Sequence, residues 1–109
     1  EVYRLYELSN QKLPNIPKKH TLYQNYPNPF NPITTIQYEL SVSSLVSITV
    51  YDLMGRKIKI LVNSQKNTGS NTVQWNGTND KGVSVKTGVY FYKIESMGYS
   101  KIRKMILIK

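Results

Sequence analysis

The stretch TTIQYELSVSSLVSITVYDLMGRKIKILV, residues 34–62, decides the fold because its apolar residues recur at every second position. Such a period of two puts one side of a segment in a core and the other in water, as in a half-buried β-strand. A polar break at residues 41–44 divides the alternation into two segments. The alternating apolar residues are Ile36, Tyr38, Leu40, Val46, Ile48 and Val50. We therefore expect two β-strands here.

A tight turn within the same stretch predicts a hairpin. Residues 52–56 are rich in turn formers, and Gly55 can take the positive φ that such a turn requires. The apolar alternation then resumes at Ile58, Ile60 and Val62. These residues predict the other arm of the hairpin.

Further strands are predicted towards the C-terminus, over residues 73–75, 89–94 and 102–108. The pair Asn76-Gly77 ends the first of them, and Met97-Gly98 turns the chain between the other two. Six or seven short strands without a helical period are typical of two packed antiparallel sheets. The sequence thus predicts an all-β fold, an immunoglobulin-like antiparallel β-sandwich of about seven strands with Greek-key links.

Two aromatic residues predict how the sandwich is organised inside. We expect Trp75 at the centre of the core. The stretch VKTGVY, residues 85–90, resembles a tyrosine corner, in which a Tyr near the start of a late strand donates its hydroxyl to nearby backbone. Tyr90 is therefore expected to be structural.

Length and composition limit the possible classes of protein. The chain has 109 residues, 39% of them apolar, which suits a single domain with one core. It has no cysteine, so disulfides and thiolate chemistry are excluded. No run of about 18 apolar residues exists, so no helix is predicted to span a bilayer.

The charge is strongly positive but scattered. Fifteen Lys and Arg against six Asp and Glu give a net charge of +9. A basic balance favours polyanions, yet these residues surround no recognisable DNA- or RNA-binding module. We predict no nucleic-acid partner, and we expect the lysines on solvent faces and strand edges, where they discourage pairing between sheets.

The sequence offers no acid–base pair for catalysis. The six acidic residues are spread over termini, strands and turns, whereas hydrolysis needs two carboxylates in different environments. The only histidine, His20, lies in a predicted linker, where we expect it to be solvated. We therefore predict that the domain is not an enzyme and binds no cofactor.

One loop has oxygen-bearing side chains at alternate positions, the arrangement of a calcium loop. In NGTNDKG, residues 76–82, the glycine is displaced from the EF-hand spacing, and the twelfth position is Thr87 rather than Glu. A turn rich in Asn and Gly explains the same residues. We predict no metal site.

The first 20 residues differ from the rest of the chain. Tyr3 and Leu5 predict one short strand, which is either the end of a preceding domain or an added edge. Residues 9–20 contain Pro14 and Pro17 and are interpreted as a linker. The predicted organisation is a linker or domain end over residues 1–20 and a sandwich domain over residues 21–109.

A proline-rich segment precedes the first long strand. We call residues 26–32 the proline strap; it consists of Tyr26, Pro27, Asn28, Pro29, Phe30, Asn31 and Pro32. Alternating prolines fix φ and exclude helix, so we expect an extended, stiff segment that is not a central strand. Two interpretations stay open: Tyr26 and Phe30 plug the end of the sandwich, or the strap is a recognition element.

Six fragments in series resemble one known family. They are LYQNYPNPFNP (22–32), TTI (34–36), VYDLMGR (50–56), WNG (75–77), GVYFY (88–92) and KMILI (104–108). Together they resemble the type A C-terminal sorting domain of the type IX (Por) secretion system. The related immunoglobulin-like module of flagellar hook-capping proteins shares some of these fragments, but the strap favours sorting.

The resemblance implies a function and a set of partners. In that family the domain directs a fused cargo protein through an outer-membrane translocon, is received by a shuttle protein, and is commonly removed by a cell-surface sortase. It implies a secreted or cell-surface cargo, membrane contact only through partners, and cleavage in the linker over residues 13–21.

We predict that partners read the strap or the basic final strand. The candidate recognition residues outside the strap are Gly55, Gly88, Tyr90, Lys101, Arg103 and Lys104. The alternative function is a retained structural or carbohydrate-binding module. For it, the tyrosines expected to be exposed, Tyr23, Tyr26 and Tyr99, would stack on sugar rings.

Overall fold

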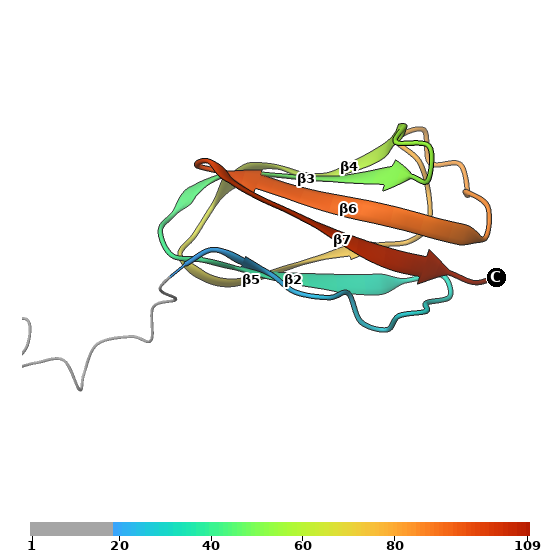
Figure 1. The fold of residues 1–109 in the computed structure, drawn as a ribbon, viewed down its shortest axis with the longest axis horizontal. Coiled ribbons are helices and arrows are strands. Elements are labelled where there is room, and N and C mark those ends of the chain that lie inside the picture. Colours follow the sequence, from blue (N-terminus) through green and yellow to red (C-terminus); the bar gives the residue numbers. More distant parts are fainter. Residues whose placement is uncertain (1–18) are drawn as a thin grey trace, which may run out of the picture.

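The computed structural model describes residues 19–109, which contain seven β-strands in two layers and no helix (Figure 1). No helix capable of spanning a bilayer is therefore found in this part of the chain. The strands are β1 (Thr21–Leu22), β2 (Thr34–Leu40), β3 (Ser44–Asp52), β4 (Lys57–Lys66), β5 (Gly69–Trp75), β6 (Gly88–Ser96) and β7 (Tyr99–Leu107). The predicted all-β fold is confirmed. The strand predicted at Tyr3 and Leu5 and most of the predicted linker lie outside the described residues.

The two sheets are antiparallel and linked as a Greek key. One sheet has the order β1-β2-β5, and the other has the order β4-β3-β6-β7. The chain crosses between the layers at the β2–β3, β4–β5 and β5–β6 connections, so β3 and β6 become neighbours although two strands separate them in sequence. This order leaves β7 at an edge, next to the region through which the strap passes.

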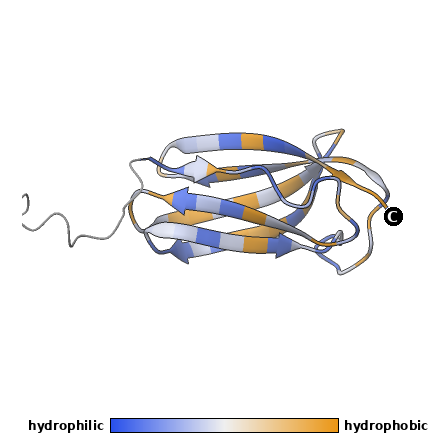
Figure 2. Ribbon diagram, turned by 90° about the horizontal axis from the view of Figure 1, so that it is seen from below, coloured by the Kyte–Doolittle hydropathy of each residue, from blue (hydrophilic) through white to orange (hydrophobic). Residues whose placement is uncertain are grey.

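The core lies between the sheets and is built from the predicted alternation. Along β2 and β3 every second side chain is buried, and Figure 2 shows hydrophobic and hydrophilic residues alternating along the strands. Trp75 is 1% exposed, and its ring lies 5.7 Å from that of Phe30 and 5.3 Å from that of Tyr90. Its indole N–H donates to the carbonyl of Thr78 at 2.8 Å. The prediction that Trp75 occupies the core is confirmed.

The tyrosine corner is also confirmed. The Tyr90 hydroxyl donates to the carbonyl oxygen of Lys86 at 2.6 Å, while its ring packs edge-on against Trp75. We expect Tyr90→Phe to lower the free energy of unfolding by about 1 kcal/mol, because the hydrogen bond to the Lys86 carbonyl is lost. Urea denaturation at neutral pH measures this loss.

Tyr38 supplies a matched control for that measurement. Its side chain is fully buried, and its hydroxyl is the one buried side-chain polar atom within residues 19–109 that lacks a hydrogen-bond partner. Tyr38→Phe removes the same oxygen without breaking a bond, so we expect no loss of stability. Equal losses in the two variants would show that the Tyr90–Lys86 hydrogen bond does not stabilise the domain.

The buried phenol of Tyr92 makes the stability of the domain depend on pH in the alkaline range. Burial raises the pKa of its phenol to about 12, partly offset by the nearby charge of Arg103. The hydroxyl donates to the Tyr23 carbonyl at 2.7 Å. Because the pKa is raised, the protonated Tyr92 phenol contributes its full stabilisation below about pH 10, the usual pKa of Tyr. This stabilisation is lost as the pH rises through 12.

The measurement compares wild type with Tyr92→Phe by urea denaturation between neutral and strongly alkaline pH. We expect the variant to be less stable at neutral pH and the gap to shrink above about pH 10. Other buried tyrosines titrate in both proteins and cancel in the difference. A gap that stays constant across the range would contradict the prediction.

His20 differs from its prediction. It is 7% exposed rather than solvated, because the ring is enclosed by the β2–β3 turn and by Tyr99, whose ring lies 5.7 Å away. Nδ1 accepts a hydrogen bond from the backbone N–H of Ser41 at 3.1 Å. The residue predicted to end the linker is therefore packed onto the sandwich.

Candidate recognition surface

The strap lies along the outer edge of β7 and is bonded to its backbone. Phe30 N–H donates to the carbonyl of Ile106 at 3.0 Å, and Ile108 N–H donates to the carbonyl of Phe30 at 2.9 Å. The Asn28 side-chain oxygen accepts from Ile106 N–H at 2.9 Å, and the Gln24 amide donates to the Lys104 carbonyl at 2.7 Å. The strap and the final strand therefore form one continuous surface.

A second set of bonds holds the start of the strap to β2. Tyr26 and Thr35 exchange two backbone hydrogen bonds of 2.9 Å. The buried Asn25 donates to the Thr34 hydroxyl at 2.9 Å and to the Pro27 carbonyl at 3.2 Å. Thr34 in turn donates to the Pro27 carbonyl at 2.8 Å. These contacts connect the strap to both sheets.

The strap is bent, so the prediction of an extended segment is wrong. The chain bends at residues 27–29 and 31–32 and makes isolated bridges only at Tyr26 and Phe30. The X–Pro bonds preceding Pro27, Pro29 and Pro32 are cis. Side-chain bonds from asparagines fold the segment against its neighbours, and Asn is favoured in such turns for this reason. That preference was the signal that could have identified Asn25 and Asn28.

The two aromatic residues of the strap have opposite environments. Phe30 is 2% exposed and packs against Trp75, as the end-plug interpretation predicts. Tyr26 is 81% exposed, so it does not plug the sandwich. Each open interpretation of the strap therefore fits one of the two residues: Phe30 anchors the segment, and Tyr26 is available to a partner.

The three basic candidates on β7 face two directions. Met105 and Leu107 are buried between the sheets, so strand alternation places Lys101 and Arg103 on the inner side and Lys104 on the outer side. Arg103 is half-buried, and its Nε donates to the carbonyl of Leu22 at 3.0 Å, which joins the two sheets. Lys101 and Lys104 are exposed.

Gly55, Gly88 and Tyr90 lie in structural positions. Gly55 has a φ of 83° in the β3–β4 turn, where the Asp52 carboxylate accepts hydrogen bonds from the backbone N–H groups of Met54 and Arg56. Those bonds and the adjacent Arg56 guanidinium hold the pKa of Asp52 below its usual value. Gly88 begins β6 opposite Leu107, and Tyr90 forms the corner described above.

Side-chain oxygen atoms of the loop at residues 76–82 accept hydrogen bonds from backbone N–H groups of the protein. The Asn79 side-chain oxygen accepts from the N–H groups of Lys81 and Val83, each at 2.9 Å, and that of Asp80 accepts from Ile60 N–H at 3.1 Å. Within residues 19–109 no group of three or more His, Cys, Asp or Glu side chains lies together as metal ligands would. The geometry is that of a turn rich in Asn and Gly.

The tyrosines proposed as a sugar platform do not lie together. Tyr23 is 38% exposed and precedes the strap by a few residues. Tyr99 is the first residue of β7, at the end of the strand away from the strap, and it is half-buried against His20. The prediction that Tyr99 is exposed is therefore wrong. No feature of the described residues favours the carbohydrate-binding alternative.

Comparison with protein families finds a match to the secretion system C-terminal sorting domain over residues 24–109. The chain belongs to this family. Comparison with curated protein sequences finds no match. The matched region contains the strap and β2 to β7. The sorting-domain family identified from the six sequence fragments is therefore confirmed.

Three solved structures resemble the sorting domain. PorZ, an essential surface component of the type IX secretion system of Porphyromonas gingivalis, is 26% identical with a TM-score of 0.57, over 81% of this chain and 11% of PorZ. Dimeric latent PorU of the same bacterium is 20% identical with a TM-score of 0.65, over 84% of this chain and 10% of PorU. FlgD of P. aeruginosa is 17% identical with a TM-score of 0.56, over 85% of this chain and 77% of FlgD.

These likenesses have different weight. PorU and FlgD show the fold alone at such identities, and FlgD agrees with the expected relation to hook-capping modules. The chain spans about a tenth of PorZ and of PorU, so the activities of those whole proteins are not carried over. Family membership makes the domain a C-terminal sorting signal for type IX secretion, which takes a fused cargo out of the cell or to its surface.

Proposed function

We propose that the sorting domain acts as a folded, non-catalytic label whose joint strap–β7 surface is read in turn by the translocon, the shuttle protein and the sortase. The observation that supports this is the hydrogen bonding of the strap to the outer edge of β7. Because the two candidate elements are held together, one partner can contact both at once. No bond needs to be broken by the domain itself, since the sortase performs the chemistry.

The exposed part of this surface combines aromatic and basic groups. Tyr26 is 81% exposed at one end, and Lys101 and Lys104 are exposed on β7. Exposed aromatic residues are enriched in protein interfaces, and basic residues steer the approach of acidic partners. Phe30 and Arg103 support the surface from below, because they pack or bond to the interior.

The packing of His20 supports a narrower cleavage window. Thr21 and Leu22 pair with Glu39 and Tyr38 in the sheet, and His20 before them is 7% exposed. A peptidase needs an accessible, extended segment, and a paired strand does not offer one. Cleavage is therefore proposed on the N-terminal side of His20. Mass spectrometry of surface-attached cargo would reveal the new C-terminus, and a terminus at His20 or any later residue would contradict this proposal.

The export role is tested with a cargo fused to residues 1–109 in a host that has the secretion system. Deletion of residues 101–109 is expected to trap the cargo in the periplasm. Because the deletion also removes Met105 and Leu107 from the core, Lys104→Glu is measured beside it. This exposed change leaves the core intact and is expected to reduce export.

Lys66→Glu is the matched control, since Lys66 ends β4 at the other edge of the same sheet. Its cargo should be exported normally. Normal export of both the deletion fusion and the Lys104→Glu fusion would refute the proposed function. Thermal unfolding of the purified chains verifies that both point variants fold.

A further inference from the structure

One end of the β7 edge is left open by the strap. The strap bonds to the carbonyl of Ile106 and to the N–H groups of Ile106 and Ile108, and Gln24, just before the strap, bonds to the carbonyl of Lys104. All these groups belong to even-numbered residues, because alternate residues of an edge strand direct their backbone groups away from the neighbouring strand. The pairing of β7 with β6 has no register shift, so the same rule extends to Ile102 and Ser100.

The hairpin geometry leads independently to the same result. Ser96 and Tyr99 flank the two-residue turn Met97-Gly98, in which both residues have positive φ. In such a turn the flanking pair exchanges hydrogen bonds, so odd-numbered residues of β7 bond to β6 and even-numbered ones do not. Within residues 19–109, the N–H and carbonyl of Ile102 accordingly have no backbone partner. The Ile102 side chain is 56% exposed.

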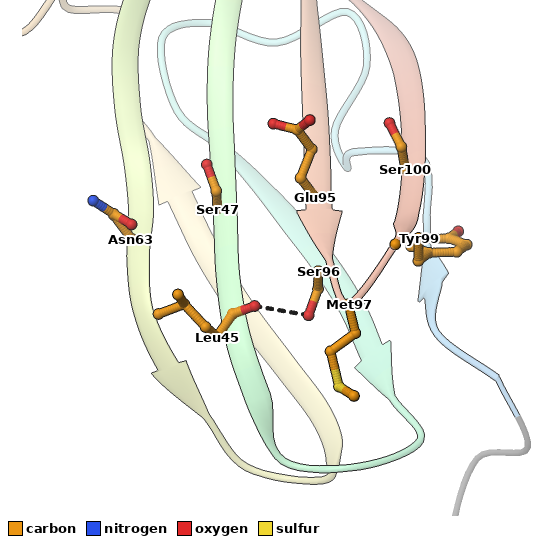
Figure 3. A pocket seen from close by; sticks show the side chains of 9 residues that line it. Leu45, Ser47, Asn63, Glu95, Ser96, Met97, Tyr99 and Ser100 are labelled. Atoms are coloured by element: carbon orange, nitrogen blue, oxygen red, sulfur yellow. Dashed lines mark hydrogen bonds between the residues drawn. The ribbon is translucent and has the colours of Figure 1, made fainter.

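The charges beside this open edge oppose pairing with a second copy of the chain. Lys101, Arg103 and Lys104 lie along it, and two such edges placed side by side would juxtapose like charges in a protein of net charge +9. An acidic strand would instead be attracted. An acidic side chain near this edge, that of Glu95, lies on β6 opposite Ser100 of β7 (Figure 3). Its charge is paired with Lys93 at 3.3 Å.

The side chains next to the edge also favour an apolar residue at one position. On the outer face Ile102 lines a shallow hollow together with Tyr51, Asp52, Leu53, Phe91 and Lys93. The Asp52 charge is paired with Arg56 at 2.8 Å. A residue added opposite Ile102 would lie on this face, next to the hollow. The neighbouring positions of the added strand would lie on the other face, beside Lys101 and Arg103, where carboxylates fit.

We propose that the free edge of β7 at residues 100–103 receives an extended segment of a partner protein, in which acidic residues alternate with apolar ones, as an added β-strand. Main-chain hydrogen bonds to Ile102 give affinity, and the basic side chains select an acidic partner. The inference rests on the proposed recognition role, and it specifies the kind of partner and its site.

The test uses the 109-residue chain and a synthetic peptide of about eight alternating Glu and Ile residues, the length of an ordinary strand. At a peptide concentration ten times the Kd, hydrogen exchange of the Ile102 amide should slow by about tenfold. Ile102→Pro should abolish binding, because proline has no N–H to donate. The variant should still fold, because the Ile102 side chain is 56% exposed and lies outside the core. The double variant K101E/K104E reverses the charge beside an acidic position of the peptide and a second charge at the same edge, so it should weaken binding by about tenfold.

The matched control is K57E/K59E, which makes the same charge change on β4, an edge strand that pairs with β3 through two irregularities. Its binding should stay within about twofold of wild type, because its charges lie at the other edge of the sheet. Equal binding of a Lys–Ile peptide would overturn the proposal, as would unchanged binding by Ile102→Pro. Self-association of the chain that Ile102→Pro removes would identify a second copy as the occupant and would also overturn it.

The peptide-binding and export experiments test the two proposals separately. If the peptide does not bind while Lys104→Glu still blocks export, the edge inference fails and the sorting role of the surface stands. If the peptide binds as expected while the Lys104→Glu and deletion fusions are exported normally, the proposed function fails and the edge remains a binding site.

Discussion

Trp75→Ala is expected to lower the free energy of unfolding by about 3–5 kcal/mol, a loss typical of a large buried aromatic side chain. The indole is 1% exposed and touches the rings of both Phe30 and Tyr90, so its removal leaves a cavity between the strap and the corner. The Thr78 carbonyl also loses its donor. A domain of this size has a total stability of about 5–15 kcal/mol, so the loss is a large share of it.

Urea denaturation measures the change, with Leu53→Ala as the control. Leu53 is 68% exposed in the β3–β4 turn, so its truncation should cost less than about 0.5 kcal/mol. Because Trp75 packs beneath the strap, we also expect Trp75→Ala to loosen the strap and increase hydrogen exchange at Ile106 and Ile108. A loss below 1.5 kcal/mol, about half the smallest expected value, would show that Trp75 is not the centre of the core.

The sequence was sufficient to predict the sandwich because its signals are local. Alternation at Ile36, Tyr38 and Leu40 places one side of β2 in the core, and that pattern does not depend on distant contacts. Turn residues such as Gly55 and the Met97-Gly98 pair then set where the strands reverse. The tyrosine corner was predictable for the same reason, since Tyr90 bonds only four residues back, to Lys86.

The surface was less predictable because it depends on contacts between distant segments. Asn28 and Ile106 are 78 residues apart in sequence, and no local pattern indicates that they bond. His20 was predicted to be solvated because its neighbours are polar and proline-rich, yet Ser41 and Tyr99 enclose it from other strands. Arg103 was grouped with Lys101 and Lys104 by sequence, whereas its bond to the distant Leu22 carbonyl gives it a structural role.

The strap itself yields the second large prediction, because its two aromatic residues separate support from recognition. Phe30→Ala is expected to cost about 3–5 kcal/mol, as for other buried aromatic residues, since its ring is 2% exposed against Trp75. Tyr26→Ala is expected to change stability by less than about 0.5 kcal/mol, since its ring is 81% exposed. Urea denaturation of the two purified chains measures both values.

Export of a fused cargo then distinguishes what the strap does. Phe30→Ala should reduce export through loss of the folded surface, and lowering the growth temperature should restore part of it. Tyr26→Ala should reduce export at every temperature, because the fold is intact and only a contact is removed. If Tyr26→Ala cargo reaches the surface as efficiently as wild type, the strap serves only to close the sandwich, and the partner must read β7 without the tyrosine.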